Sequence, residues 1–243
     1  MQQVDTEVIK KSGERVRFSK EKLQNSLFRS GADAKTVAQI MDQVREDLYQ
    51  GIPTQEIYQQ VSSLLLKKER HYAAKYRLKK AIYELGPTGF PFEYFVGALL
   101  SESGYHTRVG VQIPGACVDH EVDIWAKKGQ EHTLIECKFH SEEGLNCNVK
   151  VPLYIKSRFE DIRTQNNYGT LFDEVWVVTN TRFSEDAVQF GSCSGMNLLS
   201  WDYPRKGNLR EWIIQSGYHP ITCLISLNKI EKEFLFKLLL QSK

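Results

Sequence analysis

The chain has 243 residues, of which 41% are hydrophobic and 26% are charged, and its net charge is +2. This balance is typical of folded globular proteins and excludes disordered, fibrous and collagen-like classes. No stretch approaches the roughly 20 apolar residues of a membrane span and the start has no signal-peptide run, so we expect a cytoplasmic protein that does not use a membrane. Five cysteines without a CxxC pair predict neither a disulfide framework nor a zinc ribbon.

The charge changes sign along the chain. Residues 1–86 carry 16 Lys and Arg against 11 Asp and Glu, whereas residues 87–243 carry 16 against 19. The segment GPTGFP, residues 86–91, interrupts a helical pattern with two prolines and two glycines. We therefore place a domain boundary after residue 86, with a first domain suited to phosphate and a second that has acids to place at a site.

The first domain reads as a β-hairpin followed by helices. EVIKK and ERVRF are strand-like runs on either side of Ser12-Gly13, which predicts a two-residue turn. Apolar residues at helical spacing then predict a helix capped by Ser19, a second over about residues 34–49 and a third capped by Thr54. The basic run KKERHYAAKYRLKKAIYEL predicts a further helix before the boundary.

The second domain reads as α/β. The pattern predicts a helix over residues 92–102, strands over 105–113, 120–126 and 132–140, and a helix near 154–165. A strand over 174–180, a helix opened by Ser184 and a strand over 196–202 follow. We expect a mixed sheet flanked by helices over residues 87–205, and a helical C-terminal extension of no clear function over 206–243.

Basic residues at the N-terminal hairpin are the first functional clue. Lys10 and Lys11 precede the turn and Lys22 lies in the first turn of the next helix, so the three can converge on a polyphosphate. Adjacent lysines on a strand point to opposite faces, however, and an ordinary solvated surface fits the same residues.

The order of these elements resembles the ATP-cone domain. VIKKSGERVRFSKEKL, the later GIPTQEIY and the closing AAKYRLKKAIYEL carry the resemblance over residues 4–86, although Lys11 and Ser12 replace the commoner Arg and Asp. The resemblance implies a small helical domain that binds ATP or dATP as a regulatory ligand without hydrolysing it, and that self-associates into a homo-oligomer. The nucleotide contacts that it implies are Lys10, Lys11, Lys22, Thr54 and Tyr58.

The segment HEVDIWAKKGQEHTLIECKFH predicts a second hairpin. A turn centred on Gly129-Gln130 makes the numbers of opposed residues sum to 259, which places Asp123 opposite Glu136 and Glu121 opposite Lys138. Directly opposed carboxylates are destabilising unless a cation compensates them, and a divalent cation between Asp123 and Glu136, with Lys138 beside it, would do so. A solvated hairpin in which Lys138 pairs with Glu121, or a register shifted by one residue, fits the residues equally well.

The wider pattern resembles the Mrr-type restriction-endonuclease-like fold of the PD-(D/E)xK nuclease superfamily. A helix with an acid (FEYFVGALLSESGY), then Asp, then Glu-x-Lys, then a helix and EVWVVTNTRFSEDA carry this resemblance over residues 88–202. Asp123, Glu136 and Lys138 match the catalytic Asp and Glu-x-Lys of that family. Glu93 matches the acid that its first helix often supplies.

This resemblance implies a Mg²⁺-dependent endonuclease that hydrolyses DNA phosphodiester bonds under nucleotide control, with Asp123 and Glu136 as metal ligands. One alternative is a catalytically silent, nucleotide-sensing DNA-binding regulator on the same fold. Another is that the first domain serves only for oligomerisation.

Overall fold

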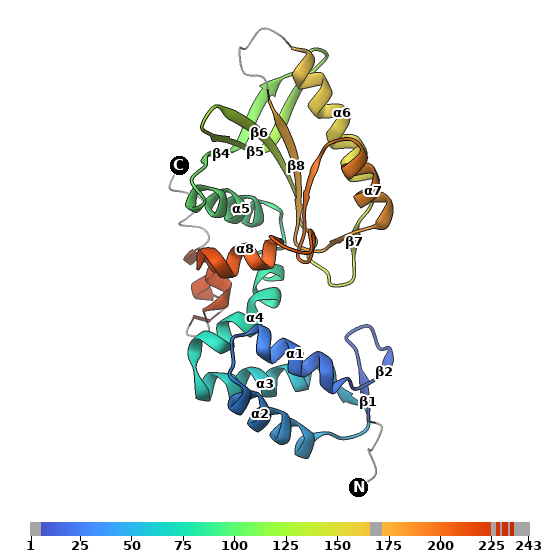
Figure 1. Cartoon of the computed structure of the whole chain (residues 1–243), viewed down its shortest axis with the longest axis vertical. Helices are drawn as coiled ribbons and strands as arrows, with labels where there is room; N and C mark the ends of the chain where they lie inside the picture. Colours follow the sequence, from blue (N-terminus) through green and yellow to red (C-terminus); the bar gives the residue numbers. More distant parts are fainter. Residues whose placement is uncertain (1–5, 166–171, 225–226, 229, 233, 236–243) are drawn as a thin grey trace. The chain divides into compact units, whose positions relative to one another are not determined.

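The structure is a computed structural model that describes residues 6–165, 172–224, 227–228, 230–232 and 234–235. The chain forms two compact units, which Figure 1 shows as ribbons. The N-terminal unit contains residues 6–78 with 223–224, and the C-terminal unit contains residues 79–222 with the described residues from 227 onward. The mixed α/β class expected from the sequence is confirmed. No helix within the described ranges is long and apolar enough to cross a membrane.

A small sheet and helices build the N-terminal unit. Strand β1 (Glu7–Ile9) pairs antiparallel with β2 (Arg15–Arg17) and parallel with β3 (Ile52–Pro53), which the sequence did not predict. The helices are α1 (Lys20–Arg29), α2 (Ala34–Asp47), α3 (Thr54–Lys68) and α4 (Arg70–Tyr83), whose last residues belong to the C-terminal unit. Apolar stripes on the first three helices meet in a core that contains Leu27, Ile40, Val61 and Leu65.

Two local expectations for this unit are wrong. The hairpin loop has three residues, not the two predicted. Lys10 N–H donates to the Glu14 carbonyl at 2.9 Å, and the loop between this pair consists of Lys11, Ser12 and Gly13. Gly13 has a φ of 84°, which residues with a Cβ rarely adopt. Ser19 does cap α1, but Thr54 does not cap α3: it is the first helical residue, and Pro53 occupies the cap position without a side-chain hydrogen bond.

The C-terminal unit contains a mixed five-stranded sheet in the order β10-β8-β6-β5-β4. Neighbours among β4, β5 and β6 run antiparallel, whereas β6, β8 and β10 run parallel. The strands are β4 (His106–Pro114), β5 (Asp119–Lys128), β6 (Glu131–Lys138), β8 (Glu174–Thr179) and β10 (Asn197–Leu199). Short strands β7 (Asn146–Cys147) and β9 (Arg182–Phe183) form a separate parallel pair.

Helices cover both faces of this sheet (Figure 1). Helix α5 (Phe90–Glu102) packs on β4, β5 and β6, while α6 (Lys150–Thr164) packs on β8 and α7 (Glu185–Cys193) on β10. Helix α8 (Leu209–Ser216) and a 3₁₀ turn (Ile221–Cys223) follow. Gly97 lets α5 approach closely, since a Cβ there would lie 2.9 Å from Val109 Cγ2. The predicted mixed sheet flanked by helices is therefore confirmed.

The register predicted for the β5–β6 hairpin is confirmed over its regular part. Ile124 faces Ile135 and Lys128 faces Glu131, as the sum of 259 requires. Backbone pairing then ends at Ile124 and Ile135, so Asp123 and Glu136 are not a further ladder pair. Instead, the Asp123 carboxylate accepts the Cys137 N–H at 2.7 Å, taking the place of a backbone acceptor.

Candidate active site

Three carboxylates from three different elements influence one another. Burial raises the pKa of Glu93, in the first turn of α5, to about 7, and the charges of Asp123 and Glu121 add to this effect. Burial also raises the pKa of Glu136, and the neighbouring Asp123 and Glu93 raise it further. Like charges thus lie together in a partly buried site, where binding of a cation is strongly favoured.

The segment that leads into α5 packs against the end of β6 and so brings Glu93 to the site of Asp123 and Glu136. Gly86 packs directly on Phe139, since a Cβ at Gly86 would lie 2.7 Å from the ring. Phe139 follows Lys138, so the start of α5 lies against the end of β6. The Glu93 carboxylate folds back toward Gly89, where an added Cβ would lie 3.0 Å from it. Glycines that look like helix breakers in the sequence therefore also permit these contacts.

Asp123 and Glu136 each use one carboxylate oxygen within the protein. Burial raises the pKa of Asp123, while its hydrogen bond from Cys137 and the charge of Arg158 oppose this rise. Glu136 Oε2 accepts from Arg158 Nη1 at 2.5 Å. Because each bond occupies a single oxygen, the geometry allows a ligand at the other oxygen of each side chain.

Arg158 was not singled out in the sequence. It lies on α6, one turn after Tyr154, and its guanidinium carbon is 4.9 Å from the centre of the Tyr154 ring. The only available signal was the spacing of an aromatic and a basic residue on the helix that follows Glu-x-Lys. That spacing alone does not show which strand the arginine reaches.

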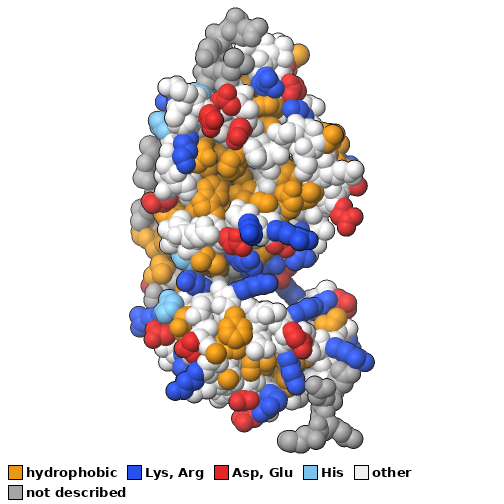
Figure 2. All heavy atoms as spheres, in the orientation of Figure 1, with side chains coloured by type: hydrophobic (Ala, Val, Ile, Leu, Met, Phe, Trp, Pro, Cys, Tyr) orange, Lys and Arg blue, Asp and Glu red, His pale blue; other side chains and the backbone are white. Residues whose placement is uncertain are grey.

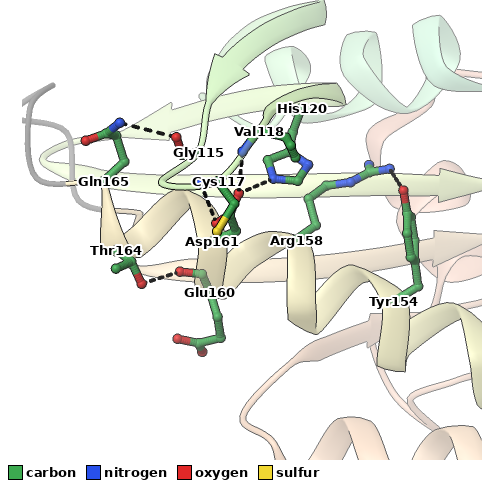
Figure 3. A network of polar contacts seen from close by, with 10 residues as sticks. All are labelled: Gly115, Cys117, Val118, His120, Tyr154, Arg158, Glu160, Asp161, Thr164 and Gln165. Carbon is green, nitrogen blue, oxygen red and sulfur yellow. Dashed lines mark hydrogen bonds and ion pairs between the residues drawn. The ribbon is translucent and has the colours of Figure 1, made fainter.

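Asp161 fixes α6 relative to β5 (Figure 3). Its carboxylate accepts the backbone N–H groups of Cys117 at 2.9 Å and Val118 at 3.4 Å, and lies 2.7 Å from His120 Nε2. The bonds from His120 and Cys117 lower the pKa of Asp161 to about 2. A Cβ at Gly115 would collide with this carboxylate. Arg158, one turn before Asp161, is thus held in place relative to the strand that carries Asp123.

Lys138 lies at the end of β6 with an exposed side chain, and its backbone is braced from the neighbouring strand. Thr179 Oγ1 donates to the Lys138 carbonyl at 2.7 Å. The Asn180 amide accepts from the His140 N–H at 2.9 Å and donates to the His140 carbonyl at 2.8 Å. Both bracing residues are fully buried. The TNTR run was recognised as part of the family pattern, but its bracing role was not.

The donors at this site suit a hard cation. Within the described ranges, no group of three or more His, Cys, Asp and Glu side chains is arranged to hold a metal ion. Two carboxylates are nevertheless enough for Mg²⁺, which commonly takes one or two of them and completes its shell with water and substrate phosphate. Asp123 and Glu136 fit such an ion by their oxygen chemistry and their raised pKa values.

The residues expected to bind a nucleotide are only partly grouped. The parallel pairing of Ile9 with Pro53 brings their successors, Lys10 and Thr54, to neighbouring strand ends. Tyr58 lies one turn further along α3 and stacks on Tyr76, with ring centres 5.4 Å apart. The start of α3 has no side-chain cap, and helix N-termini attract phosphate.

The three lysines expected to bind a nucleotide are exposed. Lys10 Nζ pairs with Glu14 at 2.8 Å, Lys11 lies in the hairpin loop and Lys22 lies on α1. No contact found among the described residues joins Lys11 or Lys22 to Thr54. Figure 2 shows Lys and Arg side chains over much of the visible face of this unit, interspersed with Asp and Glu. Its basic character is thus spread over the surface.

Comparison with known proteins assigns both units. Residues 6–84 match the model of the ATP cone domain, and residues 87–203 match the restriction endonuclease (Mrr_cat) model. The chain contains a restriction endonuclease-like domain. Its endonuclease domain follows an ATP cone domain, as the sequence resemblance implied.

Individual relatives extend these matches. An uncharacterized protein of Archaeoglobus fulgidus is 36% identical over 140 residues, which are 58% of this chain and 75% of the relative. The crystal structure of AF1548, a protein of unknown function, is 32% identical with a TM-score of 0.53 and covers 65% of this chain and 77% of its own. The DNA modification-dependent restriction endonuclease AspBHI is 14% identical with a TM-score of 0.40, over 62% of this chain and 38% of its own.

Proposed function

We propose that the restriction endonuclease domain hydrolyses DNA phosphodiester bonds with Mg²⁺, and that ATP or dATP bound to the ATP cone domain regulates it. The observation that carries this proposal is the gathering of Glu93, Asp123 and Glu136, with raised pKa values, next to Lys138. The match of residues 87–203 to the restriction endonuclease model supports the choice of substrate.

Each side chain has a separate role in this proposal. Asp123 and Glu136 hold the cation, which when bound stabilises negative charge on the reacting phosphate. Lys138 orients the attacking water through its ammonium group, on a backbone that Thr179 braces. Glu93, whose pKa is raised to about 7, can take up a proton near neutral pH or support the cation.

Regulation starts from the ATP cone domain. Lys10, Thr54 and the uncapped start of α3 suit a phosphate chain, and Tyr58 supplies an aromatic ring one turn away. Lys11 and Lys22 add positive charge from exposed positions. A nucleotide regulates only if it binds one conformational or oligomeric state better than another, so we propose that it changes self-association of the chain.

One incubation series tests the proposal. Purified full-length protein is incubated with linear, supercoiled, branched and methylated DNA, in Mg²⁺ or EDTA, with and without ATP and dATP. Cleavage of at least one DNA in Mg²⁺ but not in EDTA, at a rate that adenine nucleotide changes, would support it. Binding without cleavage on every DNA would contradict the enzymatic part.

The alternative is a nucleotide-sensing DNA-binding regulator that performs no chemistry. The observation that favours it is the ion pair between Arg158 and Glu136, because a site that is permanently neutralised in this way does not need a metal. Calorimetry with Mg²⁺ distinguishes the two functions. A silent regulator would bind DNA without binding the divalent cation at Asp123 and Glu136.

A further inference from the structure

Arg158 forms a mostly buried ion pair with Glu136, one of the three acids Glu93, Asp123 and Glu136 of the endonuclease domain. Arg158 Nη1 donates to Glu136 Oε2 at 2.5 Å, and only 12% of the arginine side chain and 18% of the glutamate side chain are exposed. The partners come from α6 and β6 and are 22 residues apart in the sequence. Tertiary packing, and not local sequence, therefore brings this cation to the site.

Arg158 makes a second contact, with the solvent-exposed Tyr154. Its Nη2 donates to the Tyr154 hydroxyl at 3.2 Å, as Figure 3 shows, and its guanidinium lies over the Tyr154 ring. The Tyr154 residue is 62% exposed. Arg158 Nε is buried and has no hydrogen-bond partner among the described residues. The guanidinium thus reaches from the mostly buried Glu136 to the exposed Tyr154, while its Nε–H group has no acceptor among the described residues.

A divalent cation bound at Asp123 and Glu136 would compete with Arg158 for Glu136. A divalent ion held by Asp123 and Glu136 would lie close to the positively charged guanidinium, and the two would repel each other in a partly dry site. Arginine, however, retains its charge at every accessible pH and cannot relieve this repulsion by losing a proton. Arg158 must then either lower the affinity for metal or leave Glu136 for another anion.

We propose, on the basis of the nuclease function above, that Arg158 is an exchangeable counter-ion that neutralises Glu136 without metal and moves to a substrate phosphate when a divalent cation binds. Tyr154 keeps the guanidinium at the mouth of the site during this exchange. The Nη1 group that leaves Glu136 can donate to an oxygen of a phosphodiester. The exchange makes the site ready for chemistry only when metal and DNA are both present.

Metal binding without DNA tests the first half of this proposal. The variants are Arg158→Met, which removes the charge, Arg158→Lys, which keeps it, and Arg163→Met, which removes an exposed arginine from the same helix. Melting temperatures are measured in EDTA and in Mg²⁺, and Mg²⁺ dissociation constants by calorimetry. We expect Arg158→Met to melt lower in EDTA, to gain more from Mg²⁺ than the wild type, and to bind Mg²⁺ at least about tenfold more tightly.

The controls separate exchange from a merely structural role. Arg163→Met and Arg158→Lys should bind Mg²⁺ as the wild type does, the second because it keeps the competing charge. If Arg158 only supports the fold, Arg158→Met will melt lower by the same amount in EDTA and in Mg²⁺, with an unchanged or weaker affinity for Mg²⁺. That result would overturn the proposal.

DNA binding tests the second half. With Ca²⁺ in place of Mg²⁺ to slow cleavage, fluorescence anisotropy should show at least about fivefold weaker DNA binding by Arg158→Met, an intermediate loss for Arg158→Lys and none for Arg163→Met. Cleavage in Mg²⁺ should fall in the same order, although the metal is bound more tightly. Unchanged DNA binding by Arg158→Met would overturn the transfer to phosphate.

Failure of this inference is distinguishable from failure of the nuclease function. If the wild type binds no divalent cation and cleaves no DNA, the nuclease function is wrong and the exchange falls with it. If the wild type cleaves DNA and Asp123→Asn does not, but Arg158→Met binds Mg²⁺ no more tightly than the wild type, only the exchange is wrong.

Discussion

The two domains differ in how their functional charged side chains are exposed and paired. In the ATP cone domain the lysines expected to bind a nucleotide are exposed, and the ion pair of Lys10 with Glu14 lies in solvent. In the endonuclease domain Glu93 and Glu136 are partly buried with raised pKa values, and Glu136 forms an ion pair with Arg158. Exposed ion pairs contribute little to stability, whereas breaking a buried pair is costly. Substitutions should therefore affect binding alone in the first domain, and both chemistry and stability in the second.

The largest effect is expected for Asp123→Asn. The amide oxygen can still accept the Cys137 N–H, so the fold keeps this contact while the site loses a metal ligand and a negative charge. We expect cleavage to fall by roughly 10³-fold or more and stability in EDTA to stay equal or rise. Plasmid cleavage and thermal unfolding measure the two, with Glu131→Gln at the exposed β5–β6 turn as the matched control. Wild-type cleavage by Asp123→Asn would remove this residue from the site.

Glu136→Gln should lose cleavage to the same extent but behave differently in unfolding. Arg158 would remain mostly buried without a carboxylate partner. We expect the free energy of unfolding in EDTA to fall by about 1–3 kcal/mol, in contrast to Asp123→Asn. Urea unfolding of both variants checks this, and equal stabilities would show that Arg158 does not depend on Glu136.

Lys138→Met should separate rate from affinity. Its side chain is exposed beside the acids and its backbone carbonyl accepts a hydrogen bond from Thr179, so the substitution should leave the fold intact. We expect the cleavage rate to fall by roughly 10²- to 10³-fold, with DNA binding in Ca²⁺ close to that of the wild type. Lys206→Met, an exposed lysine outside the site, is the control. Equal losses of rate and binding would make Lys138 a phosphate anchor instead.

The ATP cone domain should respond to substitution in its ligand binding only. We expect Lys10→Ala combined with Lys11→Ala to weaken ATP or dATP binding by about tenfold and to shift the unfolding free energy by less than about 0.5 kcal/mol. Calorimetry and urea unfolding measure these, with the exposed Lys35→Ala on α2 as the control. Absence of adenine-nucleotide binding by the wild type at millimolar concentration would refute the nucleotide site.

The smallest effect concerns pH. Because the folded-state pKa values of Glu93 and Glu136 are raised, the folded protein holds more protons than the unfolded chain between about pH 5 and 8. Their contribution to stability in EDTA therefore falls as the pH rises through that range. Melting temperatures at several pH values should show a shallower decline for Glu93→Gln than for the wild type. A steeper decline would mean that Glu93 is not part of the coupled cluster.

The two hairpins show how far sequence could predict the fold. Each has one glycine with positive φ in its turn, Gly13 at 84° and Gly129 at 63°. Gly129 begins a two-residue turn between paired Lys128 and Glu131, whereas Gly13 ends a three-residue loop. A single glycine fits both geometries, so the sequence left a one-residue register shift open for the β5–β6 hairpin, and the structure confirms the unshifted register.

The candidate site was predictable where its residues follow from strand register and family order. The hairpin pattern and the family order singled out Asp123 and Glu136, and the family order alone singled out Glu93; their roles stay predictions. Arg158 was not singled out, because its contact with Glu136 depends on the rotation of α6 about its axis and on how Asp161 anchors that helix to the β4–β5 turn. The bracing of Lys138 by Thr179 similarly requires the parallel pairing of β6 with β8, which a local pattern does not reveal.

The central claim is that Asp123 and Glu136 hold a divalent cation that the endonuclease domain uses to cut DNA. The most direct measurement is a Mg²⁺ titration of cleavage of one DNA substrate by the wild type and by Asp123→Asn, at matched protein concentration and with DNA binding measured in parallel. The account predicts cleavage by the wild type that rises with Mg²⁺ and is absent in EDTA, and no cleavage by Asp123→Asn at any Mg²⁺ concentration despite retained DNA binding. Equal cleavage by the two proteins, or wild-type cleavage that persists in EDTA, would contradict it.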